Sequence, residues 1–209
     1  MTDTQTATSQ YLIDKIATFS SATIHEAMGK QGALPSALKP ISPTMKVCGR
    51  AHTIQSMPGD NLLFHRAIAA AAAGDVLIAD VSGFYEAGYW GEILSVASAA
   101  RGIAGLVING CVRDANEIEG MGFPVFCRGL CIRGTTKHGT GAINQTISIG
   151  DIHIAPGDIV VGDRDGVVVV PASHVEETIA QCEARMEQEQ RTMQALREGK
   201  TTLEIYNWE

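Results

Sequence analysis

Three charged side chains in the middle of the chain have types and spacing that could support catalysis. Glu92 opens an apolar helical pattern. Arg113 and Asp114 follow side by side after twenty intervening residues, beyond a buried apolar run. Carboxylates are hard oxygen donors that suit Mg²⁺ or Mn²⁺, and an arginine offers a planar fork for a carboxylate or an enolate oxygen. Together they suit a site that binds a small oxo-acid beside a divalent metal.

The elements around these residues predict that they meet. Val76–Asp80 and Leu106–Asn109 read as buried strands, and the helical spacing of apolar residues predicts a helix over 91–101 between them. Strands that alternate with helices imply parallel βαβ units, whose ligands gather at the carboxyl ends of the strands. If the two strands are neighbours, the three charged residues converge at one edge of the sheet.

The start of that helix is itself suited to an anion. The backbone N–H groups of the first helical turn lack partners within the helix, so they bind a carboxylate or a phosphate readily. The predicted turn consists of Gly91, Glu92, Ile93 and Leu94.

A purely structural role for the same residues stays open at this point. Asp114 and Glu117 have the D-x-x-E spacing of a helix start, for a short helix over about 114–120. Glu92 near a helix N-terminus is favoured by the helix dipole, and Arg113 could simply be solvated.

The remaining pattern predicts one α/β domain over residues 1–209. Residues 1–18 form an extension or a helix, a helix begins near Ser20 or Ser21, and an alanine-rich helix closes at Gly74. A third strand covers 123–127, and the segment after residue 140 is rich in short strands with tight turns. A long helix over 172–199 ends the chain, with a capping box predicted from Ser173 and Glu176.

Composition excludes several classes of function. The net charge is −7 without a basic cluster, so we expect no nucleic-acid partner. No apolar stretch is long enough to span a membrane, and we expect a soluble, cytoplasmic protein. Five scattered cysteines predict reduced thiols, since the C-x-x-x-C pair Cys127 and Cys131 is a weak metal signal. No G-x-G-x-x-G turn is present, so no nucleotide cofactor is expected.

The lysines argue against covalent catalysis. A Schiff-base aldolase needs a lysine desolvated in an apolar pocket, and none of the six lysines lies within an apolar strand. Lys137 lies in a polar Thr-Thr-Lys-His-Gly turn, where we expect a solvated side chain, and we expect His138 beside it to be exposed.

The segment from AAGDVLIADV through GYWGEILSVASAARGIAGLVINGCVRDANEI resembles the RraA-like family. The resemblance continues through GTTKHGTGAIN and IAPGDIVVGDRDGVVVVP and covers most of residues 20–200. That family includes the 4-hydroxy-4-methyl-2-oxoglutarate / 4-carboxy-4-hydroxy-2-oxoadipate aldolases and the regulator of ribonuclease E activity. The most specific element is an acidic residue followed, after twenty residues, by Arg-Asp.

The resemblance implies a role for each matching position. Asp114 would be the direct ligand of Mg²⁺ or Mn²⁺, and Arg113 would bind the substrate and stabilise an enolate. Glu92 would orient a catalytic water, although the family often has aspartate there. The backbone that would hold the pyruvoyl carboxylate is that of Gly91, Glu92, Ile93 and Leu94.

The resemblance also implies a fold, an assembly and a reaction. The fold is an α/β domain with a β/β/α swivelling-type core, in homotrimers or homohexamers, where Glu187 or Glu189 of a neighbour's C-terminal helix helps complete the site. The reaction is metal-dependent retro-aldol cleavage of a 4-hydroxy-2-oxo acid to pyruvate and a second 2-oxo acid. Two alternatives stay open: an enzyme that mainly decarboxylates oxaloacetate, and a non-catalytic regulator that binds a ribonuclease.

Overall fold

A mixed sheet of eight strands forms the centre of the structure, a computed structural model that describes residues 8–208. Its strands are β1 (Lys39–Pro40), β2 (Val47–Ser56), β3 (Asp75–Asp80), β5 (Gly105–Asn109), β7 (Val125–Cys127), β9 (Gly141–Ile143), β12 (Ile159–Gly162) and β13 (Val167–Val170). Their order is β1-β7-β5-β3-β2-β12-β13, and β9 pairs with the C-terminal end of β2. The inner strands β2, β3, β5 and β7 are parallel, and the outer pairings are antiparallel.

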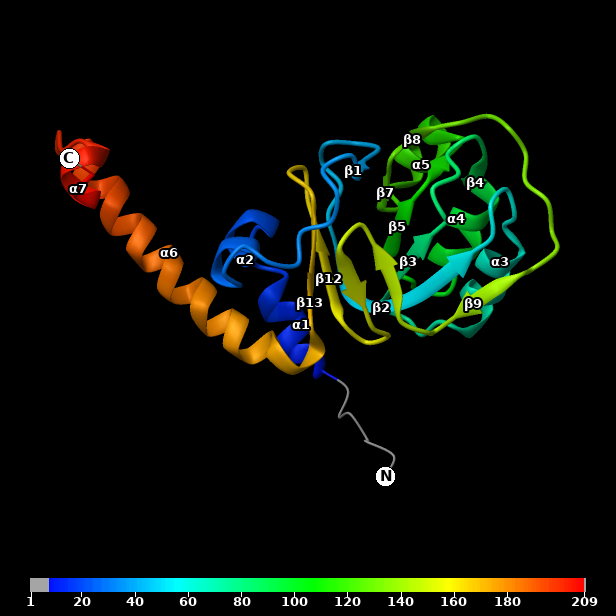
Figure 1. Ribbon diagram of the computed structural model, residues 1–209, viewed down its shortest axis with the longest axis horizontal. Coiled ribbons are helices and arrows are strands. Elements are labelled where there is room, and N and C mark those ends of the chain that lie inside the picture. Colours follow the sequence, from blue (N-terminus) through cyan, green and yellow to red (C-terminus); the bar gives the residue numbers. More distant parts are fainter. Residues whose placement is uncertain (1–7, 209) are drawn as a thin grey trace, which may run out of the picture.

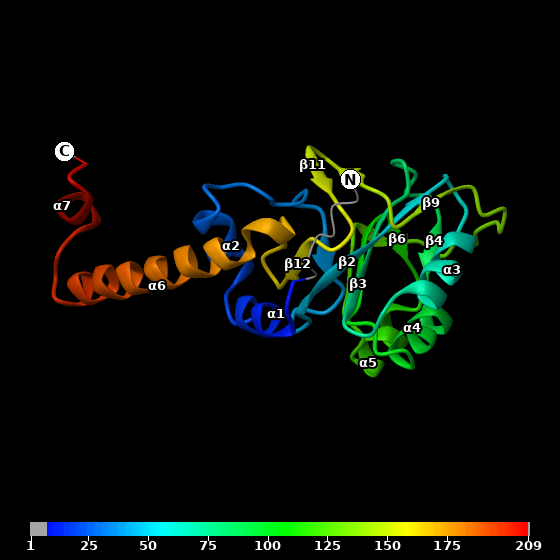
Figure 2. The same ribbon diagram turned by 90° about the horizontal axis from the view of Figure 1, so that it is seen from below.

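Helices cover one face of the sheet and its β12–β13 end, and a β-hairpin covers the other face (Figures 1 and 2). One face carries α3 (Leu62–Ala70), α4 (Glu92–Ala99) and α5 (Ala115–Met121), and the other carries the hairpin of β10 (Ile147–Ile149) and β11 (Ile152–Ile154). Packed against β12 and β13 are α1 (Gln10–Ile16), α2 (Ser21–Ala27) and the start of α6 (Val175–Arg197). A short helix α7 (Thr202–Tyr206) follows α6.

The buried strands have apolar side chains on both faces because both faces are covered. Leu77 and Leu106 belong to the core beneath α3 and α4, whereas their chain neighbours Ile78 and Val107 belong to the core beneath the hairpin. Successive side chains of a strand point to opposite faces, so a continuous apolar run fits a strand buried on both sides.

The predicted neighbourhood of the two central strands is confirmed. β3 pairs with β5 in parallel, and Asp80 at the end of one strand lies opposite Asn109 at the end of the other. Beyond these ends the chain forms a small parallel sheet from β4 (Gly88–Trp90), β6 (Cys111–Val112) and β8 (Gly129–Leu130). This small sheet carries the segments that lead into α4 and α5.

Two details of the predicted helices need correction. The capping box expected from Ser173 and Glu176 is wrong, because a 3₁₀ turn, Ala172–His174, precedes α6 and no side chain caps that helix. The alanine-rich helix ends at Ala70, and Gly74 instead lies in the turn before β3. Of the predicted N-terminal segment, residues 1–7 lie outside the described part of the chain, and α1 follows them.

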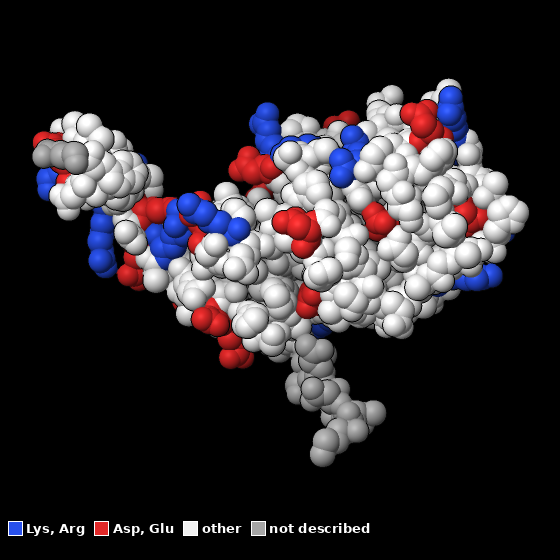
Figure 3. Space-filling view, in the orientation of Figure 1, with Lys and Arg blue, Asp and Glu red and all other residues white. Residues whose placement is uncertain are grey.

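The C-terminal helix extends away from the sheet (Figures 1 and 2). Basic and acidic side chains lie next to one another along it (Figure 3), including the i,i+4 pairs Arg185–Glu189 and Glu187–Arg191. Large apolar side chains are also exposed on α6, α7 and the residues after them: Met186, Met193, Leu196, Leu203, Tyr206 and Trp208. Within residues 8–208, no helix is long and apolar enough to cross a membrane. The five cysteines are free thiols.

The core beneath α3 and α4 allows a direct stability test. Replacement of the fully buried Leu106 by alanine is expected to lower the free energy of unfolding by about 2–5 kcal/mol, because transfer and cavity costs add. The matched change at the 54% exposed Leu203 is expected to cost about 0.5 kcal/mol or less. Urea denaturation measures both, and equal effects would contradict the assignment of this core.

Candidate active site

A small cavity lies where the N-terminal ends of α3, α4 and α5 approach one another. Its volume is about 160 Å³, below the roughly 300–1,000 Å³ of drug-sized sites, so it admits a small ligand. Both charged groups of the Arg-Asp pair line it, together with a lysine and a histidine. The lining residues are Asn61, His65, Gly88, Tyr89, Trp90, Gly91, Ile93, Leu94, Arg113, Asp114 and Lys137.

Asp114 occupies the first position before α5 but does not cap that helix. Its φ and ψ are 58° and 40°, in the left-handed region, whereas a capping residue normally has extended backbone. The carboxylate instead accepts a hydrogen bond from the backbone N–H of Glu92, the first residue of α4, at 3.0 Å. The D-x-x-E interpretation of Asp114 as an ordinary helix cap is therefore wrong, and the side chain joins two helix starts.

Arg113 lies beside this carboxylate and is held by its backbone. Its N–H donates to the carbonyl of Trp90 at 2.8 Å, and its Nε lies 3.7 Å from Oδ2 of Asp114. The side chains of Arg113 and Asp114 are 46% and 38% exposed, so both can reach a ligand from the cavity wall. The pair presents one permanent positive charge and one carboxylate at the same place.

Gly88 in β4 and Gly91 directly after that strand make room for the Arg113–Asp114 pair. A Cβ at Gly91 would lie 2.3 Å from Oδ2 of Asp114, and one at Gly88 would lie 3.3 Å from Cβ of Arg113 and 2.3 Å from the carbonyl of Cys131. Gly91 has extended backbone, so its requirement is space and not an unusual conformation. The residue before Glu92 must therefore be small for the Arg-Asp pair to approach α4.

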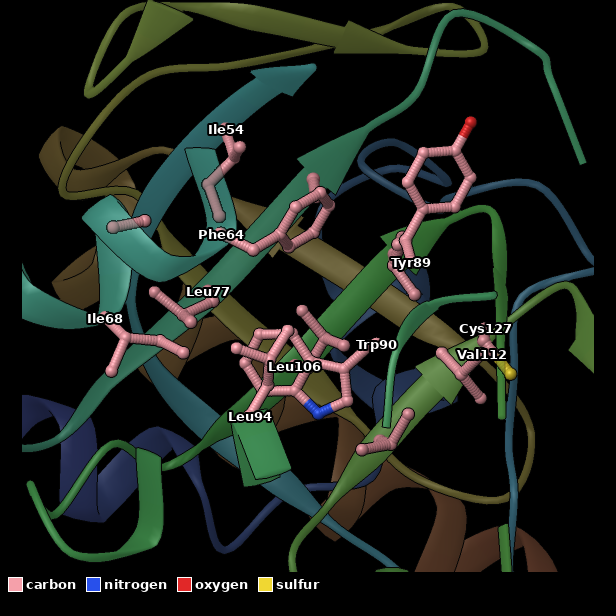
Figure 4. Close-up of a cluster of buried hydrophobic side chains, with 14 of the residues drawn as sticks. Ile54, Phe64, Ile68, Leu77, Tyr89, Trp90, Leu94, Leu106, Val112 and Cys127 are labelled. Carbon is pink, nitrogen blue, oxygen red and sulfur yellow. The ribbon is translucent and has the colours of Figure 1, made fainter. Parts of the chain in front are cut away.

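Buried aromatic side chains fix the segment between these glycines. Tyr89 and Trp90 are at most 1% exposed, and Figure 4 shows Trp90 among Leu94 and Leu106 of the core. The indole N–H of Trp90 donates to the hydroxyl of Ser95 at 2.7 Å, and that hydroxyl donates to the carbonyl of Gly91 at 3.1 Å. The first turn of α4 is thus anchored from within the core.

Lys137 is exposed, as predicted, but its side chain also lines the cavity, which the sequence did not indicate. Its Nζ donates to Oδ1 of Asn61 at 2.6 Å, while the amide of Asn61 donates to the carbonyl of Tyr89 at 2.8 Å. These two bonds define the orientation of the Asn61 amide, because its oxygen must face the lysine. His138 is exposed, as predicted.

His65 adds a titratable group one turn of α3 beyond Asn61. Partial burial, and then the positive charge of Lys137, lower the pKa of His65 below its usual value, so the imidazole is largely neutral at neutral pH. Sequence reasoning missed Asn61 and His65. The only signal was the periodic pattern of α3, which does not reveal that its first turn faces a loop 76 residues away.

Of the other residues predicted for the site, some line the cavity and others do not. Ile93 and Leu94 line the cavity, but the N–H of Glu92 is already bonded to Asp114, and the Glu92 side chain is exposed outside the cavity lining. Glu187 and Glu189 lie on α6, which extends away from the sheet on the side opposite α4 (Figures 1 and 2). They are therefore not part of this chain's own cavity.

The donors present fit a divalent cation that keeps most of its water. No group of three or more His, Cys, Asp or Glu side chains is arranged around a common point in the described part of the chain. Asp114 uses Oδ2 for Glu92 and Arg113, which leaves Oδ1 to bind a cation. Mg²⁺ is commonly held by one or two carboxylates together with waters and substrate oxygens.

The space at Gly91 can be tested directly. Gly91→Ala is expected to lower the free energy of unfolding by about 1–3 kcal/mol, because the new methyl group and the Asp114 carboxylate cannot both be accommodated. The matched control is Gly120→Ala in α5, where nothing lies within 4 Å, and a neutral or slightly stabilising effect is expected. Thermal or urea unfolding measures both, and a harmless Gly91→Ala would contradict the close approach.

The proximity of Lys137 to His65 predicts a change in titration. Lys137→Met removes a positive charge that lowers the pKa of His65, so that pKa is expected to rise. NMR titration of the imidazole signals measures it, with Lys46→Met as a control that should leave His65 unchanged. An unaltered His65 titration in Lys137→Met would place the ammonium group away from the cavity.

Comparisons with known proteins identify the family of the chain. The sequence model described as "RraA-like: Aldolase/RraA" matches residues 21–169. A protein of Halalkalibacterium halodurans named "Putative 4-hydroxy-4-methyl-2-oxoglutarate aldolase" is 32% identical over 194 residues, which cover 93% of this chain and 92% of that protein.

Solved structures share the fold over nearly the whole chain. An uncharacterized protein from Pseudomonas syringae pv. tomato superposes with a TM-score of 0.84 at 29% identity, over 94% of this chain and 92% of that one. Streptomyces coelicolor RraAS2, described as an unusual member of the RNase ES inhibitor RraA protein family, gives a TM-score of 0.78 at 27% identity, over 88% of this chain and 96% of that one. The match to the family model and the relative from H. halodurans show that the chain belongs to the RraA-like (Aldolase/RraA) family.

Proposed function

We propose that the protein cleaves the C3–C4 bond of a 4-hydroxy-2-oxo di- or tricarboxylic acid, releasing pyruvate and a second 2-oxo acid. The substrates that fit best are 4-carboxy-4-hydroxy-2-oxoadipate and 4-hydroxy-4-methyl-2-oxoglutarate. The observation that carries the proposal is the bond from the Glu92 N–H to Asp114, which places a carboxylate and the Arg113 guanidinium at the start of α4. The similarity to the H. halodurans protein supports the same reaction class.

The charges of the cavity suit a substrate with carboxylates at both ends. Arg113 and Lys137 supply two cationic groups from different segments of the chain, against the single carboxylate of Asp114. The pyruvoyl carboxylate would accept hydrogen bonds from Arg113 and from the N–H groups of Ile93 and Leu94, which have no partner one turn earlier in α4. Lys137 would bind the second carboxylate.

Asp114 would hold Mg²⁺ or Mn²⁺, and such a cation supplies Lewis-acid polarisation of the substrate's 2-oxo group when bound. The chain's own groups then account for the rest of the reaction. A water that Glu92 would orient from outside the cavity lining takes the proton of the C4 hydroxyl as the C3–C4 bond breaks. The electron pair of that bond forms the pyruvate enolate, whose oxygen Arg113 stabilises by hydrogen bonds. The same water returns that proton to C3 of the enolate, which gives pyruvate.

Oxaloacetate decarboxylation passes through the same enolate, so we expect it as a second activity of the same site. A carboxylate at C4 of oxaloacetate leaves as carbon dioxide, and the electron pair again forms the enolate of pyruvate. The same groups, Arg113 and Asp114, would therefore serve both reactions.

The proposal includes a homo-oligomer formed through the C-terminal helices. The exposed apolar side chains of α6 and α7 suit a contact between copies of the chain, as trimers or hexamers. Glu187 or Glu189 of a neighbouring copy would then approach the cavity mouth. A non-catalytic regulatory role is the second candidate function, and the likeness to RraAS2 favours it.

Turnover assays separate these functions. Pyruvate release from both hydroxy-oxo acids and from oxaloacetate is expected to stop with excess chelator and to return with Mg²⁺ or Mn²⁺. Arg113→Lys keeps the charge but loses the fork, and we expect kcat/KM to fall about 100-fold or more. Asp114→Asn is expected to lose at least about 100-fold, because the metal loses its protein ligand.

Matched controls at exposed positions are Arg164→Lys and Asp151→Asn, which should retain full activity. A folded wild-type protein that cleaves none of the three acids with metal present would reject the enzymatic proposal. The regulatory candidate would then be tested by binding to a ribonuclease of the E/ES type.

A further inference from the structure

The segment that carries Lys137 connects β8 to β9 and is tied to the start of α3 by a buried carboxylate. Asp60 is 2% exposed, and its side chain accepts hydrogen bonds from four groups. Three belong to the Lys137 segment: the hydroxyl of Thr136 at 3.1 Å, the N–H of His138, and the N–H of Gly139 at 3.1 Å. Its bonds thus flank Lys137 on both sides.

The fourth bond explains why Asn61 is available to the site. Asp60 accepts from the N–H of Leu62 at 3.0 Å, a group at the start of α3, whereas Asn61 at the N-cap position makes no capping bond. The Asn61 side chain is therefore left to bind Lys137 and the carbonyl of Tyr89. Asp60 thus holds the loop, and the adjacent Asn61 binds Lys137.

The carboxylate is compensated by neutral donors and stays ionised. Burial alone would raise the pKa of Asp60, but hydrogen bonds from His138, Leu62, Gly139 and Thr136 hold that pKa below its usual value. Backbone bonds reinforce the contact, since the N–H of Thr136 donates to the carbonyl of Gly59 at 2.7 Å. Such charge-assisted bonds are roughly twice as strong as neutral ones.

We infer that Asp60 is a positioning residue that holds Lys137 at the cavity and thereby sets affinity for the second carboxylate of the substrate. The inference rests on the proposed function for the substrate, but the placement of Lys137 can be measured without turnover. An exposed lysine side chain on an untied loop would lose rotamer and backbone freedom on binding, which lowers affinity. The Asp60 bonds remove most of that cost in advance.

The first test needs no substrate. In Asp60→Asn the neutral amide offers one acceptor atom in place of two, so hydrogen exchange across residues 133–140 is expected to accelerate about tenfold or more. Acylation of Lys137 by an N-hydroxysuccinimide ester, followed by peptide mapping, should accelerate as well. Thr136→Val removes one donor only and should give a smaller change of the same kind, even if Asp60→Asn folds poorly. Unchanged exchange and acylation in both variants would overturn the inference.

The second test is a double-mutant cycle on kcat/KM with Asp60→Asn and Lys137→Met. Asp60→Asn alone is expected to raise KM for the hydroxy-oxo acids about tenfold and to change kcat less. In the Lys137→Met background the same change should cost about twofold or less, because the two residues act through one contact. Equal effects in both backgrounds would show that Asp60 only supports the fold, and overturn the inference.

Asp151→Asn, in the exposed turn between β10 and β11, is the matched control and should leave loop exchange and turnover unchanged. A wild-type protein without turnover would reject the proposed function alone. Exchange and acylation would then still decide whether Asp60 holds Lys137.

Discussion

The hydrogen bond from the Glu92 N–H to the Asp114 carboxylate is the interaction on which the site depends. It joins the N-terminal ends of two helices that follow neighbouring parallel strands, β3 and β5. The left-handed backbone at Asp114 turns the side chain away from its own helix, at a cost of order 1–3 kcal/mol for a non-glycine residue. Space for the contact comes from Gly91, where any side chain would meet the carboxylate.

The three helices around the cavity share a feature at their starts. Asn61, Gly91 and Asp114 occupy the N-cap positions of α3, α4 and α5, and none of them caps its own helix with a side chain. A side-chain cap normally stabilises a helix by about 0.5–2 kcal/mol. Here the polar side chains at two of these positions are directed into the site, and the helix starts face the place where an anionic ligand would bind.

The sequence predicted the part of the site that depends on the order of strands and helices along the chain, namely Arg113 and Asp114. The strand-helix alternation over 76–127 implied neighbouring parallel strands, and the end of each strand fixed where Arg113 and Asp114 lie. It could not decide between a helix cap and a ligand group, because both readings need the same residues at the same spacing. The backbone conformation of Asp114 excludes the helix cap, and no spacing reveals that conformation.

The position of Lys137 in the site could not be predicted from the sequence pattern, because it depends on contacts between segments far apart in the chain. Lys137 lies in a polar segment whose composition is typical of a solvated turn, yet Asp60 holds that segment against α3 across 76 to 79 residues of sequence. Likewise, Ser173 and Glu176 have capping-box spacing, but a 3₁₀ turn begins one residue earlier and displaces the helix start. Tertiary hydrogen bonds and turn geometry decided both cases.

Mn²⁺ binding followed by electron paramagnetic resonance, with pyruvate present, tests the central claim most directly. Asparagine tolerates left-handed backbone as aspartate does, so Asp114→Asn should keep its free energy of unfolding within about 0.5 kcal/mol. If the Asp114 carboxylate is a metal ligand, wild-type protein binds Mn²⁺ and the variant of equal stability does not. Equal Mn²⁺ affinity in both proteins would contradict the account and return Asp114 to a structural role between two helices.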